Sequence, residues 1–243
     1  MTLVAAFRCQ QGGILLCADR EENDGYAKRE VDKIYRIGEF VPCQVFIAGS
    51  GPGNIIRLAN EEIHESMKSS AKNGENVFVE HRSIIEQALN AIYVKFAKIL
   101  KLEPMNLIVV VAPRDSGINP LLYQTDTSVL IPESFYVAHG SGKIVADYLS
   151  DRLYRPYQNG RLDKGMIGLV AAFILREAEH SGIGVGMGFD MVFIHENNKS
   201  LHFIPPKYVE EIQAGASSLE TAVHGYWKDH VTIPEWLAKT TLA

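Results

Sequence analysis

The sequence predicts an α+β fold in which two antiparallel β-sheets are stacked and each outer face is covered by a pair of helices. The main observation is the order of the expected elements: strands, two helices, strands, two helices, and strands again. Sheets and amphipathic helices must bury their apolar faces against another layer, and this order fits a four-layer αββα sandwich. The 243 residues are 47% hydrophobic and contain no linker-like stretch, so they suffice for one large core.

Apolar alternation and short apolar runs predict the strands of the first group, before the first helix. Gln-Gln-Gly-Gly predicts the turn of an initial hairpin, Asn23-Asp24-Gly25 predicts a second turn, and Gly38-Glu39 is expected to turn the chain once more. The expected strands cover residues 2–9 and 13–19, a short segment reaching Lys33 and Ile37, and residues 45–48.

Apolar residues at helical spacing predict four helices, and apolar runs between and after them predict the remaining strands. The helical stripes run from Ile55 to Met67, from Ile84 to Phe96, from Ile144 to Leu153 and through residues 162–179. The later strands are expected at residues 105–112, 121–124, 129–131, 135–138, 189–194 and 201–204, the last two joined over residues 196–198.

We expect one domain at residues 1–204 and a C-terminal extension at residues 205–243. The extension contains a possible helix near residues 218–228 and an apolar Trp236-Leu237 pair. Packing on the domain and use in subunit contacts are both compatible with this pattern.

Composition excludes several classes of function. A formal net charge of −5 with mixed signs leaves no basic stripe, which argues against nucleic acid as a partner. The longest apolar runs, such as residues 107–113, are too short to span a membrane, and no signal peptide is evident. Three cysteines without metal spacing predict buried free thiols in a reducing cytoplasm. The expected location is therefore cytoplasmic. We expect no metal or organic cofactor.

Four residues near the N-terminus stand in an order that suggests a site. Thr2 follows the initiator methionine, Asp19 ends an apolar strand, Lys33 stands on an Ile-Tyr-Arg-Ile strand, and Gly49 ends another apolar run. If Met1 is removed, Thr2 carries both a hydroxyl nucleophile and a free amine to serve as its base. The amine has a reference pKa of about 7.7–8.0, so a neutral fraction exists near pH 7.

The other three residues have distinct expected roles. An ammonium at Lys33 would lower the pKa of the Thr2 amine and hydroxyl, and Asp19 would keep the lysine charged and oriented. The backbone N–H of Gly49 would stabilise the oxyanion. The plainer interpretation of Asp19 and Lys33 is a surface ion pair of little energetic value. Their placement on apolar strands favours burial.

These residues resemble the threonine, aspartate, lysine and glycine of the proteasome β-subunit family and its bacterial relatives, which are N-terminal-nucleophile (Ntn) hydrolases. Gly140-Ser141-Gly142 resembles the Gly-Ser-Gly turn of that family, and Ser181-Gly182 resembles its late Ser-Gly. The resemblance covers roughly residues 2–204. It implies the Ntn hydrolase fold, catalysis by Thr2 and supporting roles for Ser141 and Ser181. A helix N-cap is the alternative role of Ser141.

The sequence also departs from the family pattern. One extra residue separates Thr2 from Asp19, and about two fewer separate Asp19 from Lys33. Ala178 stands where the family has an aspartate, three positions before the late serine. Glu177 and Glu179 flank it, and either is a candidate to replace the missing carboxylate.

The function expected from the site is a threonine-type peptidase or amidase that acts on a peptide or protein substrate through an acyl-enzyme ester. The resemblance further implies a ring-like homo-oligomer, and by analogy alone an ATPase unfoldase partner. Two alternatives remain open. One is a non-catalytic ring or scaffold subunit that retains Met1, and the other is an acyl transferase or peptide ligase that uses an amine acceptor.

Overall fold

The computed structural model describes most of the chain, and every structural statement below concerns these described parts. They are residues 2–23, 28–40, 43–114, 118–154, 162–181, 185–186, 188–195 and 202–230.

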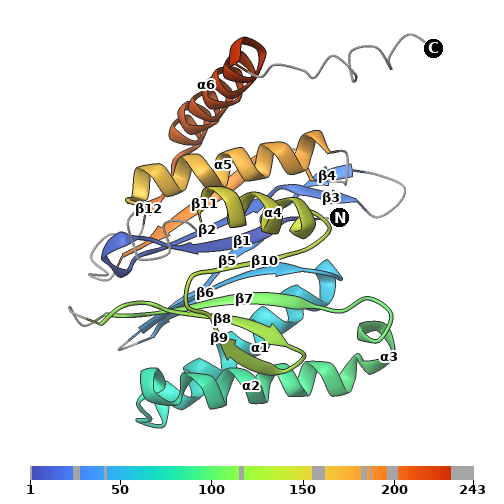
Figure 1. Cartoon of the computed structure of the whole chain (residues 1–243). Helices are drawn as coiled ribbons and strands as arrows, with labels where there is room; N and C mark the ends of the chain where they lie inside the picture. Colours follow the sequence, from blue (N-terminus) through green and yellow to red (C-terminus); the bar gives the residue numbers. More distant parts are fainter. Residues whose placement is uncertain are drawn as a thin grey trace.

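The strands form two five-stranded antiparallel sheets and a separate two-stranded sheet (Figure 1). The first sheet has the order β10-β1-β2-β11-β12, the second the order β5-β6-β7-β8-β9, and β3 pairs with β4. The expected α+β class with antiparallel sheets is confirmed. The strands are β1 (Val4–Arg8), β2 (Ile14–Asp19), β3 (Glu21–Asn23), β4 (Lys28–Glu30), β5 (Ile34–Phe40), β6 (Cys43–Ser50), β7 (Asn106–Pro113), β8 (Leu121–Asp126), β9 (Val129–Pro132), β10 (Tyr136–His139), β11 (Phe189–Ile194) and β12 (His202–Phe203).

Helices lie on the outer faces of the two large sheets (Figure 1). α1 and α2 cover the second sheet, α4 and α5 cover the first, and α6 packs against α5. The helices are α1 (Gly53–Lys72), α2 (Val77–Lys95), α3 (Ala97–Leu100), α4 (Lys143–Leu153), α5 (Lys164–His180) and α6 (Pro206–His230), with a 3-10 turn η1 (Gln10–Gly12).

The alternation of side chains along β1 shows how the layers form, because successive residues of a strand point to opposite faces. Val4 and Ala6 are buried in a cluster that joins the two sheets. Ala5 and Phe7 point the other way, into a cluster shared with α4 and α5. A third cluster lies between the second sheet and α1 and α2, where Ile47 is buried. Both faces of each large sheet are therefore apolar.

Gly38 does not turn the chain, contrary to expectation. β5 continues through it to Phe40, and the register with β6 shifts between Arg36 and Gly38. A Cβ on Gly38 would lie 2.7 Å from the Phe40 ring, so the glycine makes room for that ring within an irregular strand. Glycine inside a strand often marks such an irregularity instead of a turn.

The C-terminal helix is longer than expected. α6 begins at Pro206, a residue that suits the first turn of a helix because its missing N–H needs no partner there. Its first half packs on α5 through Val209, Ile212 and Ala216. The division at residue 204 stays a prediction. The expected features that fall wholly or partly outside the described residues include the 23–25 turn, the Ser181-Gly182 pair, the 196–198 loop, the 201–204 strand and the Trp236-Leu237 pair.

None of the helices in the described part of the chain combines the length and the apolar character needed to cross a bilayer.

Candidate functional site

The hairpin of β1 and β2 brings the segment that carries Thr2 next to Asp19. Val4 pairs with Ala18, so the residues just outside this pair, Leu3 and Asp19, lie side by side. The Leu3 amide donates to Asp19 Oδ1 at 2.7 Å, and the Asp19 amide donates to the Leu3 carbonyl at 3.0 Å. The register therefore places the Asp19 carboxylate next to the segment that carries Thr2.

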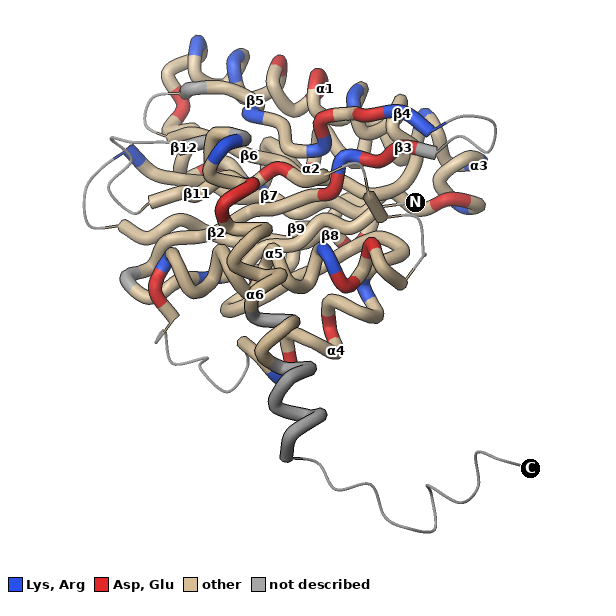
Figure 2. Tube along the Cα trace, turned by 90° about the horizontal axis from the view of Figure 1, so that it is seen from above, with Lys and Arg blue, Asp and Glu red and all other residues tan. Residues whose placement is uncertain are grey.

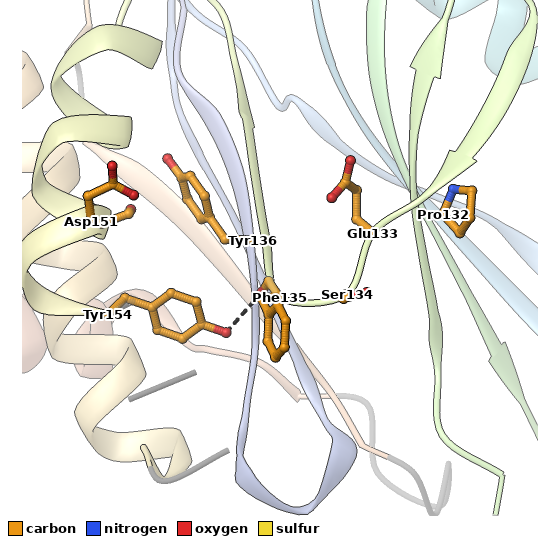
Figure 3. Close-up of a pocket in the computed structure, with 8 residues that line it drawn as sticks. Pro132, Glu133, Ser134, Phe135, Tyr136, Asp151 and Tyr154 are labelled. Carbon is orange, nitrogen blue, oxygen red and sulfur yellow. Dashed lines mark hydrogen bonds between the residues drawn. The ribbon is translucent and has the colours of Figure 1, made fainter. Parts of the chain in front are cut away.

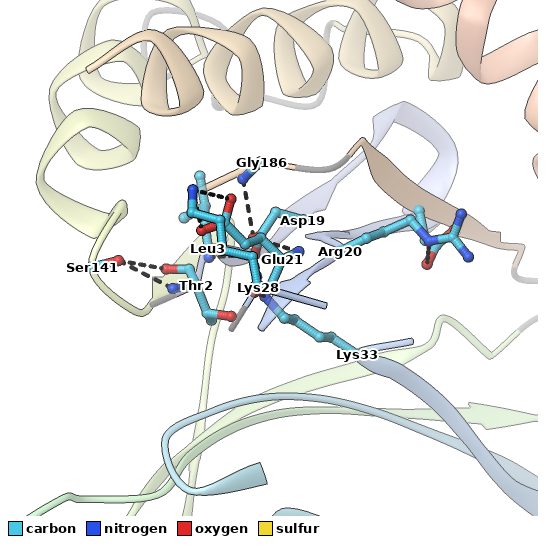
Figure 4. A network of polar contacts seen from close by, with 10 residues as sticks. Thr2, Leu3, Asp19, Arg20, Glu21, Lys28, Lys33, Ser141 and Gly186 are labelled. Carbon is cyan, nitrogen blue, oxygen red and sulfur yellow. Dashed lines mark hydrogen bonds and ion pairs between the residues drawn. The ribbon is translucent and has the colours of Figure 1, made fainter. Parts of the chain in front are cut away.

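Asp19 is a fully buried acceptor for several donors (Figure 4). Besides Leu3, the amides of Glu21 and Gly186 donate to Oδ2 at 3.2 and 3.4 Å. Lys33 Nζ lies 2.8 Å from Oδ1. A carboxylate that accepts several N–H bonds is held in one orientation. Asp19 thus connects β1, β2, β3 and the segment before β11.

Lys33 is buried and its ammonium is paired, as expected for a charge inside a protein. Its side chain is 8% exposed, and Nζ donates to Asp19 and, at 2.5 Å, to the carbonyl of Glu21. Burial lowers the pKa of Lys33, and the negative charge of Asp19 opposes that effect. The pair is thus not the surface ion pair of the plainer interpretation.

The turn after β10 holds the other side of Thr2. The Thr2 nitrogen donates to Ser141 Oγ at 3.1 Å, and Ser141 Oγ donates to the Thr2 carbonyl at 3.3 Å. The Gly142 amide donates to the same carbonyl at 3.2 Å. Gly140 has φ of 103°, and a Cβ there would lie 2.1 Å from the Thr2 carbonyl oxygen. The N-cap of α4 is Gly142 and not Ser141. The hydroxyl of Ser141 instead forms hydrogen bonds with Thr2.

A cavity of about 780 Å³ opens beside Thr2. Thr2, Lys33, Gly49 and Ser141 all line it, together with the start of α1 and part of the β3–β4 sheet. Gly49 pairs with Leu107, and a Cβ at Gly49 would lie 2.9 Å from side-chain atoms of Ile56 and Leu107. Close packing therefore requires glycine at a wall of the cavity. Four of the six predicted site residues line one cavity, and Asp19 lies behind it.

Ser181 lies elsewhere. It ends α5, where its hydroxyl donates to the Ala178 carbonyl at 2.6 Å and its amide to the Glu177 carbonyl at 3.0 Å. No contact between Ser181 and Thr2 is seen in the described residues, and its predicted catalytic role stays a prediction. Ala178 is buried in the core against the first sheet. Of its two acidic neighbours, Glu179 reaches toward Gly186, where a Cβ would lie 3.4 Å from Glu179 Oε1.

A smaller cavity of about 330 Å³ lies between α4 and the segment that joins β9 to β10 (Figure 3). Tyr136, Ser150 and Tyr154 line it, and the Tyr154 hydroxyl donates to the Phe135 carbonyl at 2.9 Å. It contains none of the predicted site residues. The cavity beside Thr2 is therefore the candidate active site. The described residues contain no group of three or more side chains suited to hold a metal ion.

Sequence reasoning missed two residues next to the Asp19–Lys33 pair. Glu21 and Gly186 both contact it, but Glu21 stands in a polar stretch and Gly186 in a glycine-rich run. The sequence carried one signal for Glu21. Side chains alternate between the two faces of a strand, so residue 21 is expected on the same side as Asp19.

The chain was compared with known proteins at the level of sequence and structure. No protein-family model matches it. No curated protein matches it either. Solved structures do match. An Anbu (Gly-1) mutant from Hyphomicrobium sp. strain MC1 has a TM-score of 0.72 and is 15% identical, with 96% of this chain and 100% of that chain covered.

Two further Anbu structures are similar. The helical assembly of the Anbu complex from Pseudomonas aeruginosa has a TM-score of 0.72 and is 13% identical, with 96% of this chain and 98% of that chain covered. Anbu from Yersinia bercovieri, described as ancestral beta-subunit, has a TM-score of 0.71 and is 12% identical over the same shares. At these identities the likeness shows the fold alone.

The family expected from the sequence is corrected by these comparisons. The resemblance to the proteasome β-subunit family is wrong as an assignment, because the similar structures are Anbu proteins. Four of the six site residues that carried the resemblance line one cavity, so they describe the local geometry of that cavity and not the rest of the chain. A match over 96% of this chain also includes part of the segment after residue 204, which the resemblance did not cover.

Proposed function

We propose that the chain is a threonine-type peptidase or amidase whose nucleophile is Thr2 after removal of Met1, built on the four-layer αββα sandwich of Ntn hydrolases. One observation carries the proposal: Thr2, Lys33 and Gly49 line a single cavity, and Asp19 holds the lysine from behind. Burying the ammonium of Lys33 costs free energy, and a catalytic task in the cavity that Lys33 shares with Thr2 would explain why the charge is kept.

In this mechanism the Thr2 hydroxyl attacks the substrate carbonyl, and its proton passes to the Thr2 amine, directly or through one water. The ammonium of Lys33 lowers the pKa of both groups and so raises the neutral fraction of the amine. The N–H of Gly49 donates to the oxyanion as the tetrahedral intermediate forms. Collapse expels the leaving amine, which takes the proton from the Thr2 ammonium.

The second half-reaction releases the product. Water attacks the acyl-enzyme ester, the amine accepts a proton from that water, and the Thr2 oxygen leaves with the proton returned to it. The hydrogen bonds between Thr2 and Ser141 keep the amine side of the nucleophile in place through both steps. Catalytic assistance from Ser181 belongs to the proposal as well, although only its contacts within α5 are seen in the described residues.

We further propose a homo-oligomer. The helical assembly of the similar Pseudomonas aeruginosa complex supports this, and α6 with the remainder of residues 205–243 is a candidate for subunit contacts. An ATPase unfoldase partner stays a prediction from analogy. The three free, buried cysteines are consistent with a reducing compartment such as the cytoplasm.

An intact-mass spectrum before and after exposure to a peptide epoxyketone tests the proposed function. We expect a protein that lacks Met1 and gains one inhibitor mass, because the reagent needs both the hydroxyl and the free amine of Thr2. A protein that retains Met1 and gains no mass would contradict the hydrolase proposal and favour a scaffold subunit. Adding a peptide amine to a substrate digest then separates hydrolysis from transfer, since a transferase forms a new amide product.

Activity is expected to fall on the alkaline side at a pH below the ordinary lysine value of 10.5. Burial lowers the pKa of Lys33, so the ammonium loses its proton earlier than a free lysine does as the pH rises. The neutral lysine no longer lowers the pKa of the Thr2 amine and hydroxyl, so the hydroxyl is activated less. The pH dependence of kcat/KM checks this, with Lys33→Arg as the comparison, because a guanidinium does not titrate in this range.

A further inference from the structure

The carboxylate of Glu21 is buried behind the proposed catalytic pair and takes no part in the mechanism above. Glu21 begins β3, and only 3% of the residue is exposed. A buried carboxylate costs free energy unless it is paired, and a position this buried is normally apolar. Replacing buried ionic groups by apolar ones often leaves stability unchanged or improves it, so packing alone does not explain the charge.

Lys28 on β4 forms an ion pair with this carboxylate and donates a hydrogen bond to its Oε2. Its Nζ lies 3.0 Å from Oε1 and 3.1 Å from Oε2. The two residues are diagonal neighbours, because Glu21 pairs with Glu30 and Asn23 pairs with Lys28 in the β3–β4 sheet. Acidic and basic residues are interspersed along this small sheet (Figure 2). Lys28 therefore ties β4 to β3 at the residue nearest the catalytic pair.

Gly186 covers another side of Glu21. A Cβ at Gly186 would lie 2.9 Å from Glu21 Oε2, so the missing side chain leaves room for the carboxylate. The amide of Gly186 meanwhile donates to Asp19 Oδ2. One short segment thus packs on Glu21 and on Asp19 together.

The main chain of Glu21 touches both members of the catalytic pair (Figure 4). Its carbonyl accepts the hydrogen bond from Lys33 Nζ at 2.5 Å, and its amide donates to Asp19 Oδ2 at 3.2 Å. A movement of this residue shifts both contacts at once. Displacing a catalytic group by about 1 Å can cost about a hundredfold in rate.

We propose that Glu21 is a positioning residue. Its carboxylate pairs with Lys28 and packs against Gly186, and so fixes the backbone that holds Lys33 and Asp19 in place near Thr2. The inference rests on the proposed function and adds a residue to its machinery. The charge of Glu21 has a second effect, since Glu22 and Glu21 both oppose the lowering of the Lys33 pKa, after Asp19. The acidic groups that face Lys33 are thus Asp19 on β2 and these two glutamates on β3.

The test compares Glu21→Gln with Glu30→Gln, which removes a carboxylate from the same small sheet at an exposed position. In Glu21→Gln we expect the Lys33 pKa, measured by NMR on labelled lysine, to fall. We expect the maximal rate of epoxyketone adduct formation to drop about tenfold, with little change in the inhibitor concentration for half-maximal rate. Glu30→Gln should leave the Lys33 pKa and the rate close to those of the wild type.

Gly186→Ala supplies a second variant that keeps every charge. Its Cβ displaces the Glu21 carboxylate, so the rate should fall as in Glu21→Gln. Lys28→Met, at an exposed position, replaces Glu21→Gln if that variant does not fold. Unchanged Lys33 pKa and unchanged rate in a folded variant would overturn the positioning role. A wild type that forms no adduct would overturn the hydrolase proposal and, with it, the positioning role of Glu21 in catalysis. The Lys33 pKa in Glu21→Gln then still shows whether the two charges interact.

Discussion

Thr2→Ala is expected to lower peptide hydrolysis by about a thousandfold or more, because it removes the nucleophile while the rest of the cavity is kept. The free amine and the Asp19–Lys33 pair remain, so any residual rate reports only substrate binding and oxyanion stabilisation. The measurement is release of new amines from a mixture of peptide amides, compared with wild-type protein at equal concentration. Adduct formation with the epoxyketone should disappear in the same variant.

The matched control is Thr2→Ser, which keeps a hydroxyl and an amine at the same position. We expect this variant to retain adduct formation and a rate within about tenfold of the wild type, since the reacting groups are unchanged. Thermal unfolding should be similar in the two variants, because each changes only a small side chain. Equal activity in wild type and Thr2→Ala would show that the hydrolysis comes from another group.

Much of the layer arrangement follows from local pattern. In β1 and β2 nearly every residue is apolar, and such a strand must be covered on both faces. The stripes on α1 and α2 supply a cover for the second sheet at helical spacing. The hairpin between residues 9 and 13 also brings Thr2 and Asp19 to the same end of the strands. These two candidate residues were therefore predictable as neighbours.

The missed features depend on contacts between distant parts of the chain. Glu21 stands among charged residues and has the pattern of a loop, yet it is buried because Gly186, far along the chain, packs on it. Gly38 carries a turn signal, but the pairing of β5 with β6 continues past it, so Gly38 lies within a strand. The start of α6 at Pro206 is favoured by its packing on α5, which a short window of sequence does not contain.

Asp19→Ala is expected to cost about 3–5 kcal/mol in the free energy of unfolding, because it removes the carboxylate that pairs with the buried ammonium of Lys33 at 2.8 Å. The same change removes the acceptor of the Leu3, Glu21 and Gly186 amides. Lys33→Met should cost less, because Asp19 then keeps those three N–H donors. Denaturant unfolding of each variant measures the difference, and adduct formation should be lost in both.

The double variant separates stability from catalysis. With both charges gone, no ammonium is left unpaired, so Asp19→Ala combined with Lys33→Met should be more stable than Asp19→Ala alone. It should nevertheless stay inactive, because the ammonium that tunes Thr2 is missing. Additive losses in stability would mean that the pair interacts weakly. Recovered activity would mean that the charge at Lys33 has no catalytic role. If the buried pair is kept for catalysis and not for stability, the double variant should regain stability but not activity.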